Sequence, residues 1–329
     1  MAICLEIITH SHVRLSNVHS SFQEDTLQQE PLYQIYQKHR QGITSSKNTV
    51  IQRINLFCGN QRNCDVSTLL TPSLHSWILA SARLRSIKEF NLDVSGVRIS
   101  SFPNPILRCS SLVKLELKLG QNSNIFVLPN SMDLPRLTHL KIDSIPIDGS
   151  GRLAEDIHKH GMFLRALSEV RELRLSEWFL HLSLRGFFAF RPLVRFVNLR
   201  SIKLEMNLSP WSVKKLGWLL HISPYIKSLS IVIAPGPGMP RTITPDSEWA
   251  RVSWLPRNLY HLRSVKIRGI LGNISQLKLV ELIFKYAVAL QEMDLYSWKK
   301  STTEEQLIAF GEKLRTLPIA SSKISTFFL

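Results

Sequence analysis

The sequence predicts an α/β protein in which one strand-and-crossover unit repeats along most of the chain. The stretch SSLVKLELKLG at 110–120 alternates apolar and charged residues, and this period of two is typical of a strand with one buried face. The apolar-x-x-apolar-x-apolar triplet in this stretch then recurs from residue 51 to residue 329. Repetition at such a spacing indicates a stacked, solenoid-like architecture.

The triplet occurs ten times, and successive first positions lie 25 to 36 residues apart. Because 44% of the residues are hydrophobic, such triplets also arise by chance. The polar residues between the apolar ones are therefore the stronger evidence that the triplets form repeated strands. Each triplet is predicted to form a strand whose apolar residues enter the core. The triplets are Ile51/Ile54/Leu56, Ile87/Phe90/Leu92, Leu112/Leu115/Leu117, Leu137/Leu140/Ile142, Val170/Leu173/Leu175, Leu199/Ile202/Leu204, Ile226/Leu229/Ile231, Leu262/Val265/Ile267, Leu290/Met293/Leu295 and Ile324/Phe327/Leu329.

Helical crossovers are predicted between several of these strands. Ser209 and Pro210 form a helix start, and Thr302 with Glu305 forms a capping box. Strands alternating with helix-bearing crossovers predict an irregular leucine-rich-repeat solenoid, with parallel strands on the concave face and helices and loops on the convex face. The expected apolar stripes of the helices are Leu74/Trp77/Ile78/Ala82, Leu277/Val280/Phe284/Ala287 and Leu307/Phe310/Leu314.

The 329 residues include 41 Lys and Arg against 25 Asp and Glu, which gives a net charge of +16. The excess is densest from Arg185 to Lys215, but no run of consecutive basic residues predicts a disordered nucleic-acid-binding arm. No segment approaches the length of a membrane helix, and AICLEII is too short and too acidic for a signal peptide. Four cysteines do not suggest a disulfide scaffold. We therefore expect a protein of the cytoplasm or nucleus that contacts no membrane.

The sequence offers no catalytic or metal-binding motif. It contains no serine elbow, zinc-protease helix, phosphate-binding loop or dinucleotide fingerprint. Cys58 and Cys64 lack a second pair of ligands, and His158 and His160 lie two residues apart and so do not share a helical face. The sequence therefore predicts a non-enzymatic protein without a metal or cofactor.

The outward positions of the strands predict a binding surface. Where Leu115 and Leu117 enter the core, Lys114 and Glu116 point outward on the concave face. Aligning the triplets gives a row of outward residues with a basic centre, which indicates a protein-binding surface; the alternative is a solvated sheet whose charges keep it soluble. The row is Asn55, Asn91, Glu116, Lys141, Arg174, Lys203, Ser230, Lys266 and Asp294. The candidate partner-binding residues are Lys114, Glu116, Lys141, Arg174, Lys203 and Lys266.

Two stretches resemble the plant F-box proteins that carry leucine-rich repeats and a C-terminal FBD domain. The first, at 102–147, matches the family's Cys-x-x-Leu-Val-x-Leu-x-Leu and Leu-Pro-x-Leu-x-x-Leu-x-Leu patterns. The second, at 262–329, is similar to the FBD domain, and the resemblance covers roughly residues 50–329. The matching residues of the first stretch are Cys109, Leu112, Val113, Leu115, Leu117, Leu134, Pro135, Leu137, Leu140 and Ile142. Those of the second are Gly269, Leu279, Val280, Ala287, Leu290, Met293, Pro318, Ala320 and Ser321.

The resemblance implies a domain order and a function. Residues 1–49 are a polar segment without the Leu-Pro-x-x-x-Leu signature of an F-box, 50–250 form the repeat solenoid, and 251–329 form the FBD-like repeats. Family members choose the substrates of a cullin ubiquitin ligase and dock on its Skp-type adaptor through the F-box. The chain is therefore expected to be a truncated or F-box-less member that binds a protein substrate, and the missing F-box argues against the adaptor and cullin as partners.

Two other interpretations remain open at this point. Some F-box repeat proteins that sense hormones bind an anionic cofactor such as an inositol phosphate, which would meet Lys141, Arg174, Lys203 and Lys266 here. Nucleic-acid binding through the +16 charge is the other, and a solenoid without an aromatic stacking platform argues against it.

Overall fold

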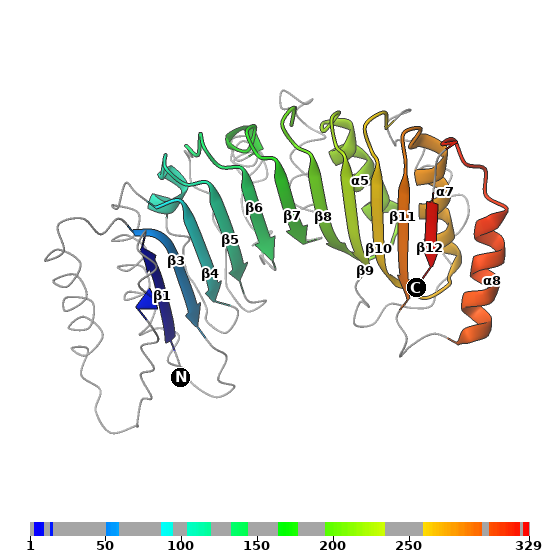
Figure 1. Cartoon of the computed structure of the whole chain (residues 1–329), viewed down its shortest axis with the longest axis horizontal. Coiled ribbons are helices and arrows are strands. Elements are labelled where there is room, and N and C mark those ends of the chain that lie inside the picture. The colour runs from blue at the N-terminus through cyan, green and yellow to red at the C-terminus, as the bar shows by residue number, and fades with distance from the viewer. Residues whose placement is uncertain are drawn as a thin grey trace, which may run out of the picture. The chain divides into compact units, whose positions relative to one another are not determined.

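The computed structural model describes residues 3–9, 14–15, 51–58, 87–94, 104–119, 133–143, 164–176, 195–233, 259–297, 303–322 and 325–328. The chain divides into two compact units, Met1–Ala166 (unit 1) and Leu167–Leu329 (unit 2). Both are built from parallel strands that follow one another in the sequence, and unit 2 adds helical crossovers (Figure 1). The predicted α/β class with sequential parallel strands is therefore confirmed.

The described residues of unit 1 form six strands and one 3-10 helix, η1. Its sheet order is β2-β1-β3-β4-β5-β6, and the neighbours from β3 to β6 pair in parallel. The elements are β1 (Ile3–Thr9), β2 (Arg14–Leu15), β3 (Ile51–Cys58), β4 (Glu89–Val94), η1 (Asn104–Arg108), β5 (Lys114–Leu119) and β6 (His139–Asp143).

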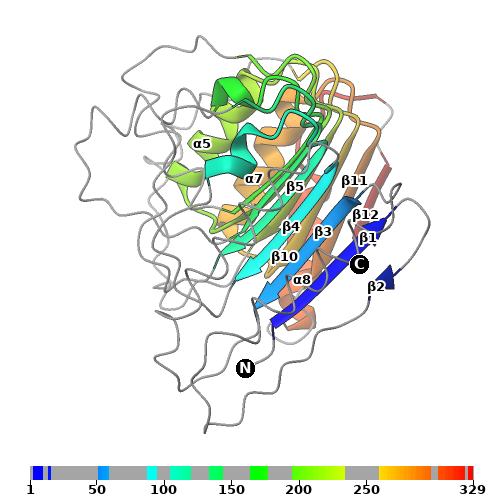
Figure 2. The same ribbon diagram turned by 90° about the vertical axis from the view of Figure 1, so that its left-hand side faces the viewer.

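Strand β1 lies in the segment 1–49, for which the sequence analysis predicts no strand. It runs antiparallel to β3, with Ile3 opposite Cys58 and Ile7 opposite Ile54. Figure 2 shows β1, β3 and β4 side by side. An antiparallel first strand departs from a purely parallel repeat array, because the repeat begins only at β3.

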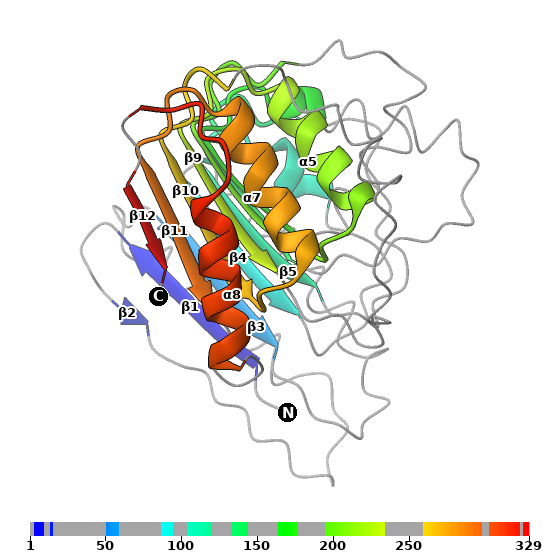
Figure 3. The ribbon, with the colours of Figure 1, turned by 90° about the vertical axis from the view of Figure 1, so that its right-hand side faces the viewer.

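The part of unit 2 that the structure describes forms six strands in sheet order β7-β8-β9-β10-β11-β12, and every neighbouring pair is parallel. Helices α5, α7 and α8 lie on one face of this sheet (Figure 3). The strands are β7 (Glu172–Ser176), β8 (Ser201–Met206), β9 (Ser228–Ile233), β10 (Ser264–Ile270), β11 (Glu292–Ser297) and β12 (Ser325–Phe328). The helices are α5 (Pro210–His221), α7 (Ile274–Tyr286) and α8 (Glu304–Arg315).

The apolar triplets from β4 to β11 form the core, as predicted. A strand is present at each of the ten triplets. The first residue of the triplet lies in the turn before the strand and is at most 1% exposed in each repeat from β4 to β11. Burying one such side chain contributes about 1.5–3 kcal/mol, so the stacked rungs carry much of the folding free energy. These first residues are Ile87, Leu112, Leu137, Val170, Leu199, Ile226, Leu262 and Leu290.

The family-matching Cys109 is part of this core and is 5% exposed. Its Sγ lies 3.3 Å from Ser111 Oγ, which donates to the carbonyl of Ile87 in the preceding rung at 2.8 Å. Cys109 is thus a packing residue next to a hydroxyl that links two rungs.

Helix caps follow the sequence in one case and depart from it in another. Ser209 caps α5, and its side chain accepts from the Ser212 amide. The predicted Thr302–Glu305 capping box is wrong, because Thr303 caps α8 and accepts from the Gln306 amide. With Thr303 as cap, Glu304 and Glu305 fall in the first turn, where the helix dipole favours negative charge.

The helical stripes are also partly confirmed. Val280, Phe284 and Ala287 are buried, and so are Phe310 and Leu314, whereas Leu277 and Leu307 are only half-buried. The predicted helix at 73–83 lies outside the described residues.

Helix α7 carries a cap that the sequence analysis misses. Asn273 and Gln276 form a full capping box. The Gln276 amide is 1% exposed; it donates to the Gly269 carbonyl at 2.9 Å and accepts from the Leu271 amide at 2.7 Å. Gly269 lies at a register shift of β10 with φ of 92°, a conformation that favours glycine. The buried amide therefore fixes the turn from β10 into α7.

Candidate interaction surface

On each strand, the side chains that alternate with the buried ones do not enter the core. We call these positions the outer face; they lie on β3–β6 in unit 1 and on β7–β11 in unit 2. The predicted alignment of the row is confirmed within each unit by the strand pairing. In unit 1 the row is Asn55, Asn91, Glu116 and Lys141. In unit 2 it is Arg174, Lys203, Ser230, Lys266 and Asp294.

In unit 1, the cations of the outer face are held in ion pairs across and along the strands. Arg53 donates to both carboxylate oxygens of Glu89, at 2.7 and 2.8 Å. The Lys118 Nζ lies 3.1 Å from Asp93 Oδ2. The predicted site residues are paired in the same way, Lys114 with Glu116 at 2.7 Å and Lys141 with Asp143 at 3.1 Å.

These four pairs leave the described outer face of unit 1 electrically balanced. Its four cations match four carboxylates, and each carboxylate faces a cation. The side chains are a fifth to a half exposed, so each pair contributes little stability, about 0–1 kcal/mol. The effect of the pairing is on the surface potential rather than on the fold.

Unit 2 pairs Lys266 in the same manner. Its Nζ lies 2.8 Å from Asp294 Oδ2, and this hydrogen bond together with the carboxylate charge raises the pKa of Lys266. Arg268 lies over the ring of Tyr296, 5.3 Å from its centroid. Both contacts join β10 to β11.

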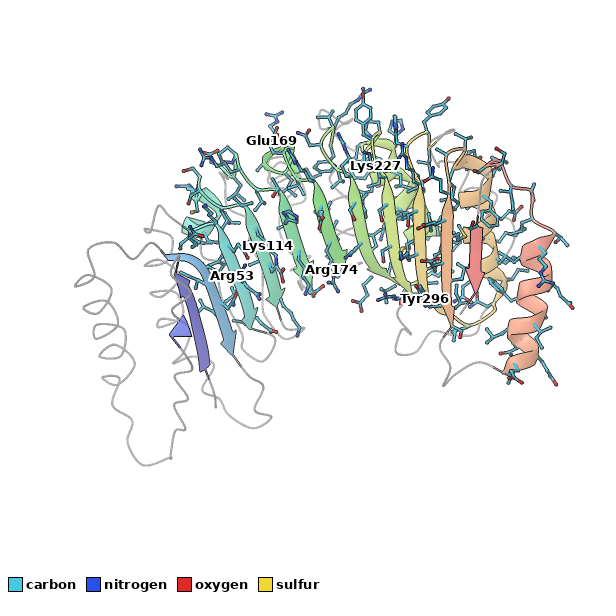
Figure 4. The ribbon with its side chains drawn as sticks, viewed as in Figure 1. Arg53, Lys114, Glu169, Arg174, Lys227 and Tyr296 are labelled. Carbon is cyan, nitrogen blue, oxygen red and sulfur yellow. The ribbon has the colours of Figure 1, made fainter. Side chains whose placement is uncertain are left out.

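Arg174 and Lys203 differ from every other predicted site residue. They are directly opposite each other on β7 and β8, both are exposed, and neither forms an ion pair within the described ranges. Like charges directly opposite on neighbouring strands are destabilising. Figure 4 shows Arg174 on its strand. A bound carboxylate or phosphate would relieve the repulsion between these two side chains.

The outer face of unit 2 is nevertheless not basic as a whole. Over β7–β11 its four cations are matched by four carboxylates: Arg174, Lys203, Lys266 and Arg268 against Glu172, Glu205, Glu292 and Asp294. The basic centre that the sequence predicts therefore applies to one outward position per strand, and the outer face as a whole is balanced. For an inositol phosphate on this unit, Arg174 and Lys203 are the two predicted cations without an ion pair.

A further group of basic residues lies where the strands of unit 2 begin, and two of them, Arg195 and Arg200, belong to the dense basic stretch from Arg185 to Lys215. We call this the amino edge, made of the turns 168–171, 195–200, 222–227, 259–263 and 287–291. It holds five cations and one carboxylate, Glu169, whose Oε2 accepts from Asn198 Nδ2 at 2.9 Å. Figure 4 shows Lys227 and Glu169 at this edge. The cations are Arg171, Arg195, Arg200, Lys227 and Arg263.

Backbone hydrogen bonds align four of these cations from one strand to the next. The Arg171 carbonyl accepts from the Arg200 amide at 2.8 Å, the Arg200 carbonyl from Lys227 at 2.8 Å, and the Lys227 carbonyl from Arg263 at 2.9 Å. Neighbouring strands lie about 4.8 Å apart, so the hydrogen bonds place one cation per strand in a continuous row. The signal for this row is in the sequence, because each cation directly follows the first residue of a triplet.

Comparison with known proteins adds no relative: no family model matches the chain, and no curated protein matches it. Within the described ranges no group of three or more His, Cys, Asp or Glu side chains is placed to hold a metal ion. Among the residues that the structure describes, no helix is long and apolar enough to cross a membrane.

Proposed function

We propose that the chain is a leucine-rich-repeat scaffold that binds a protein partner through unit 2. One observation carries the proposal: parallel strands in register align one outward side chain per strand into a row, and that row contains the like-charged neighbours Arg174 and Lys203. A row of this kind recognises an extended partner surface through many small contacts.

We further propose that the chain is a member of the plant F-box, leucine-rich-repeat and FBD family in which residues 1–49 carry no F-box signature. Two contacts made by the quoted family residues Ser321 and Ala320 support this. Ser321 Oγ donates to the Leu290 carbonyl at 2.5 Å, and the Ala320 amide donates to the Phe284 carbonyl at 3.1 Å. These bonds fasten the stretch after α8 to α7 and to the turn before β11, so the FBD-like residues act as one packed unit.

The test uses affinity capture of the tagged full chain from the cells that express it. The double variant Arg174→Glu and Lys203→Glu reverses the like-charged pair, and Lys285→Glu with Lys313→Glu makes the same charge change on α7 and α8. We expect a stoichiometric protein partner that the helix variant keeps and the strand variant loses. Equal capture by both variants, or no enriched protein, would contradict the proposal.

The family proposal has a separate test. Purified Skp-type adaptor is mixed with the purified chain and passed over a size-exclusion column. A member without the F-box elutes apart from the adaptor. Stoichiometric co-elution would show that residues 1–49 or another segment provides an adaptor-binding module, and the account of the N-terminal segment would be wrong.

A further inference from the structure

The amino edge of unit 2 combines charge, hydroxyl groups and exposed apolar side chains. The three central strands begin with the same dipeptide pattern, a cation followed by serine: Arg200-Ser201, Lys227-Ser228 and Arg263-Ser264. The serines are in register on β8, β9 and β10, and all three are half-buried. We call each of these dipeptides a cation-serine step. Each step offers a cation and a hydroxyl donor, and neighbouring steps lie about 4.8 Å apart.

Carboxylates are scarce at these central strands. Glu169 and Glu172 lie at β7 and Glu292 at β11, so the acidic side chains flank the three cation-serine steps. Lys227 and Arg263 are exposed and form no ion pair within the part of the chain that the structure describes. Among the described residues the edge therefore holds more cations than carboxylates, whereas the outer face of each unit holds equal numbers of the two.

Apolar side chains project from the same turns. Val197, Tyr225, Tyr260 and Val288 come from four successive turns, and their exposed fractions are 44, 46, 62 and 38%. They are half of the large hydrophobic side chains that are exposed among the described residues. Tyrosine and arginine are enriched at protein–protein interfaces, so this composition favours a protein partner.

Tyr225 is fixed in place by its neighbours. The Arg200 guanidinium lies 5.5 Å from the centroid of its ring and also donates to the Val197 carbonyl at 2.7 Å. The His261 ring lies 5.3 Å from Tyr225 at an interplanar angle of 51°. Because Arg200 occupies one face of the ring and His261 lies tilted against it, Tyr225 is a poor platform for stacking a nucleobase.

The backbone carbonyls at the amino edge already accept hydrogen bonds, so a ligand at this edge contacts side chains. The carbonyls of Arg200, Lys227 and Arg263 each accept two amide hydrogen bonds from the next strand. A partner strand therefore cannot add to this edge through main-chain bonds, and carboxylates that meet the cation and hydroxyl of each step provide the complementary contact.

We propose that the amino edge of unit 2 binds an acidic polypeptide segment in which apolar residues are interspersed with Asp and Glu. The proposal rests on the proposed function and names the chemistry of the partner. Carboxylates meet the three cation-serine steps, and apolar side chains contact Tyr225, Tyr260, Val197 and Val288.

The test measures fluorescence anisotropy of the full chain with a labelled ten-residue peptide of alternating Asp, Glu and Leu. The triple variant Arg171→Ala, Lys227→Ala and Arg263→Ala removes exposed cations of the edge. The matched control removes three exposed cations from the turns of unit 1, with Lys88→Ala, Arg108→Ala and Arg136→Ala. Thermal melts verify folding, and if the triple variant does not fold, the single variants Lys227→Ala and Arg263→Ala replace it.

We expect the peptide to bind the unmodified chain and the unit 1 control within about twofold of each other, and the edge variant at least about tenfold more weakly. Equal weakening by both variants, or an unchanged affinity of the edge variant, would overturn the assignment to this edge. Tighter binding of a ten-nucleotide thymidine strand than of the peptide would overturn the class of partner. If the peptide does not bind but the affinity capture still yields a partner, the edge proposal fails while the scaffold function stands.

Discussion

The two units have the same kind of core but differ in how their surface charges are arranged. In unit 1, opposite charges face each other across the strands, as Arg53 and Glu89 do, and the described outer face is neutral by pairing. In unit 2, Arg174 faces Lys203, and a row of cations lies at the amino edge. Burial determines the fold of both units, whereas the arrangement of the described surface charges differs between them. The comparison teaches that a net charge of +16 becomes informative only once its position is known.

The largest expected loss of stability concerns the buried repeat positions that occur in both units. Leu117 in β5 and Leu204 in β8 occupy the same position of the repeat and are 2% and 1% exposed. Replacing either by alanine removes buried methyl groups and leaves a cavity, which costs about 2–5 kcal/mol. Urea unfolding of Leu117→Ala and Leu204→Ala measures both losses. A loss below about 1 kcal/mol in one unit only would break the claim that the units share one core design.

The next effect concerns the ion pairs of unit 1. Glu89→Ala removes the carboxylate that holds Arg53, and because both side chains are a third or more exposed we expect a loss of only about 0.5–1 kcal/mol. The loss should shrink in high salt, because salt screens exposed charges. Urea unfolding at two salt concentrations measures it. A stabilised Glu89→Ala variant would contradict the view that this face satisfies its own charges.

The matching substitution in unit 2 is expected to have the opposite sign. Arg174→Ser removes a like charge from the neighbourhood of Lys203, so the free energy of unfolding should stay unchanged or rise by up to about 0.5 kcal/mol. The same urea experiment measures it. If Arg174→Ser destabilises the protein as much as Glu89→Ala does, the difference between the two outer faces disappears.

The smallest effect is a dependence on alkaline pH. Asp294 raises the pKa of Lys266 in the folded state, so the folded protein holds this proton more tightly than the unfolded chain. The resulting stability is fully present below the unfolded pKa of about 10.4 and is lost as the pH rises through the folded pKa. The difference in unfolding free energy between the parent protein and Lys266→Gln should therefore narrow above about pH 10.4. A constant difference across this range would show that the contact does not depend on the lysine charge.

Much of the fold follows from the triplet pattern. The pattern predicts the ten strands and their register, because one buried first residue and two buried strand residues recur in each rung from β4 to β11. Strand β1 was missed because the segment 1–49 was judged by its polar composition, although Ile3, Leu5 and Ile7 alternate with a period of two.

The site follows from the sequence less well. The alignment gave the outward row, but it cannot show that Lys114 and Lys141 bond to carboxylates two residues further along the same strands, since that depends on side-chain conformation. The amino-edge cations are visible in the sequence after each first triplet residue. The prediction singles out Arg195 and Arg200 in the dense basic stretch but does not place Arg171, Lys227 and Arg263 beside them, because it considers the strands and not the turns that precede them.

The most direct test of the account places a photo-crosslinking residue at Tyr225 in unit 2 and, as the matched position, at Arg136 in a turn of unit 1. The full chain is expressed in its own cells and irradiated with and without an excess of the acidic peptide. The account predicts a discrete crosslinked protein from position 225, suppressed by the peptide, and none from position 136. Equal crosslinking from both positions, or a crosslink at 225 that the peptide leaves unchanged, would contradict the claim that unit 2 binds its partner through the amino edge.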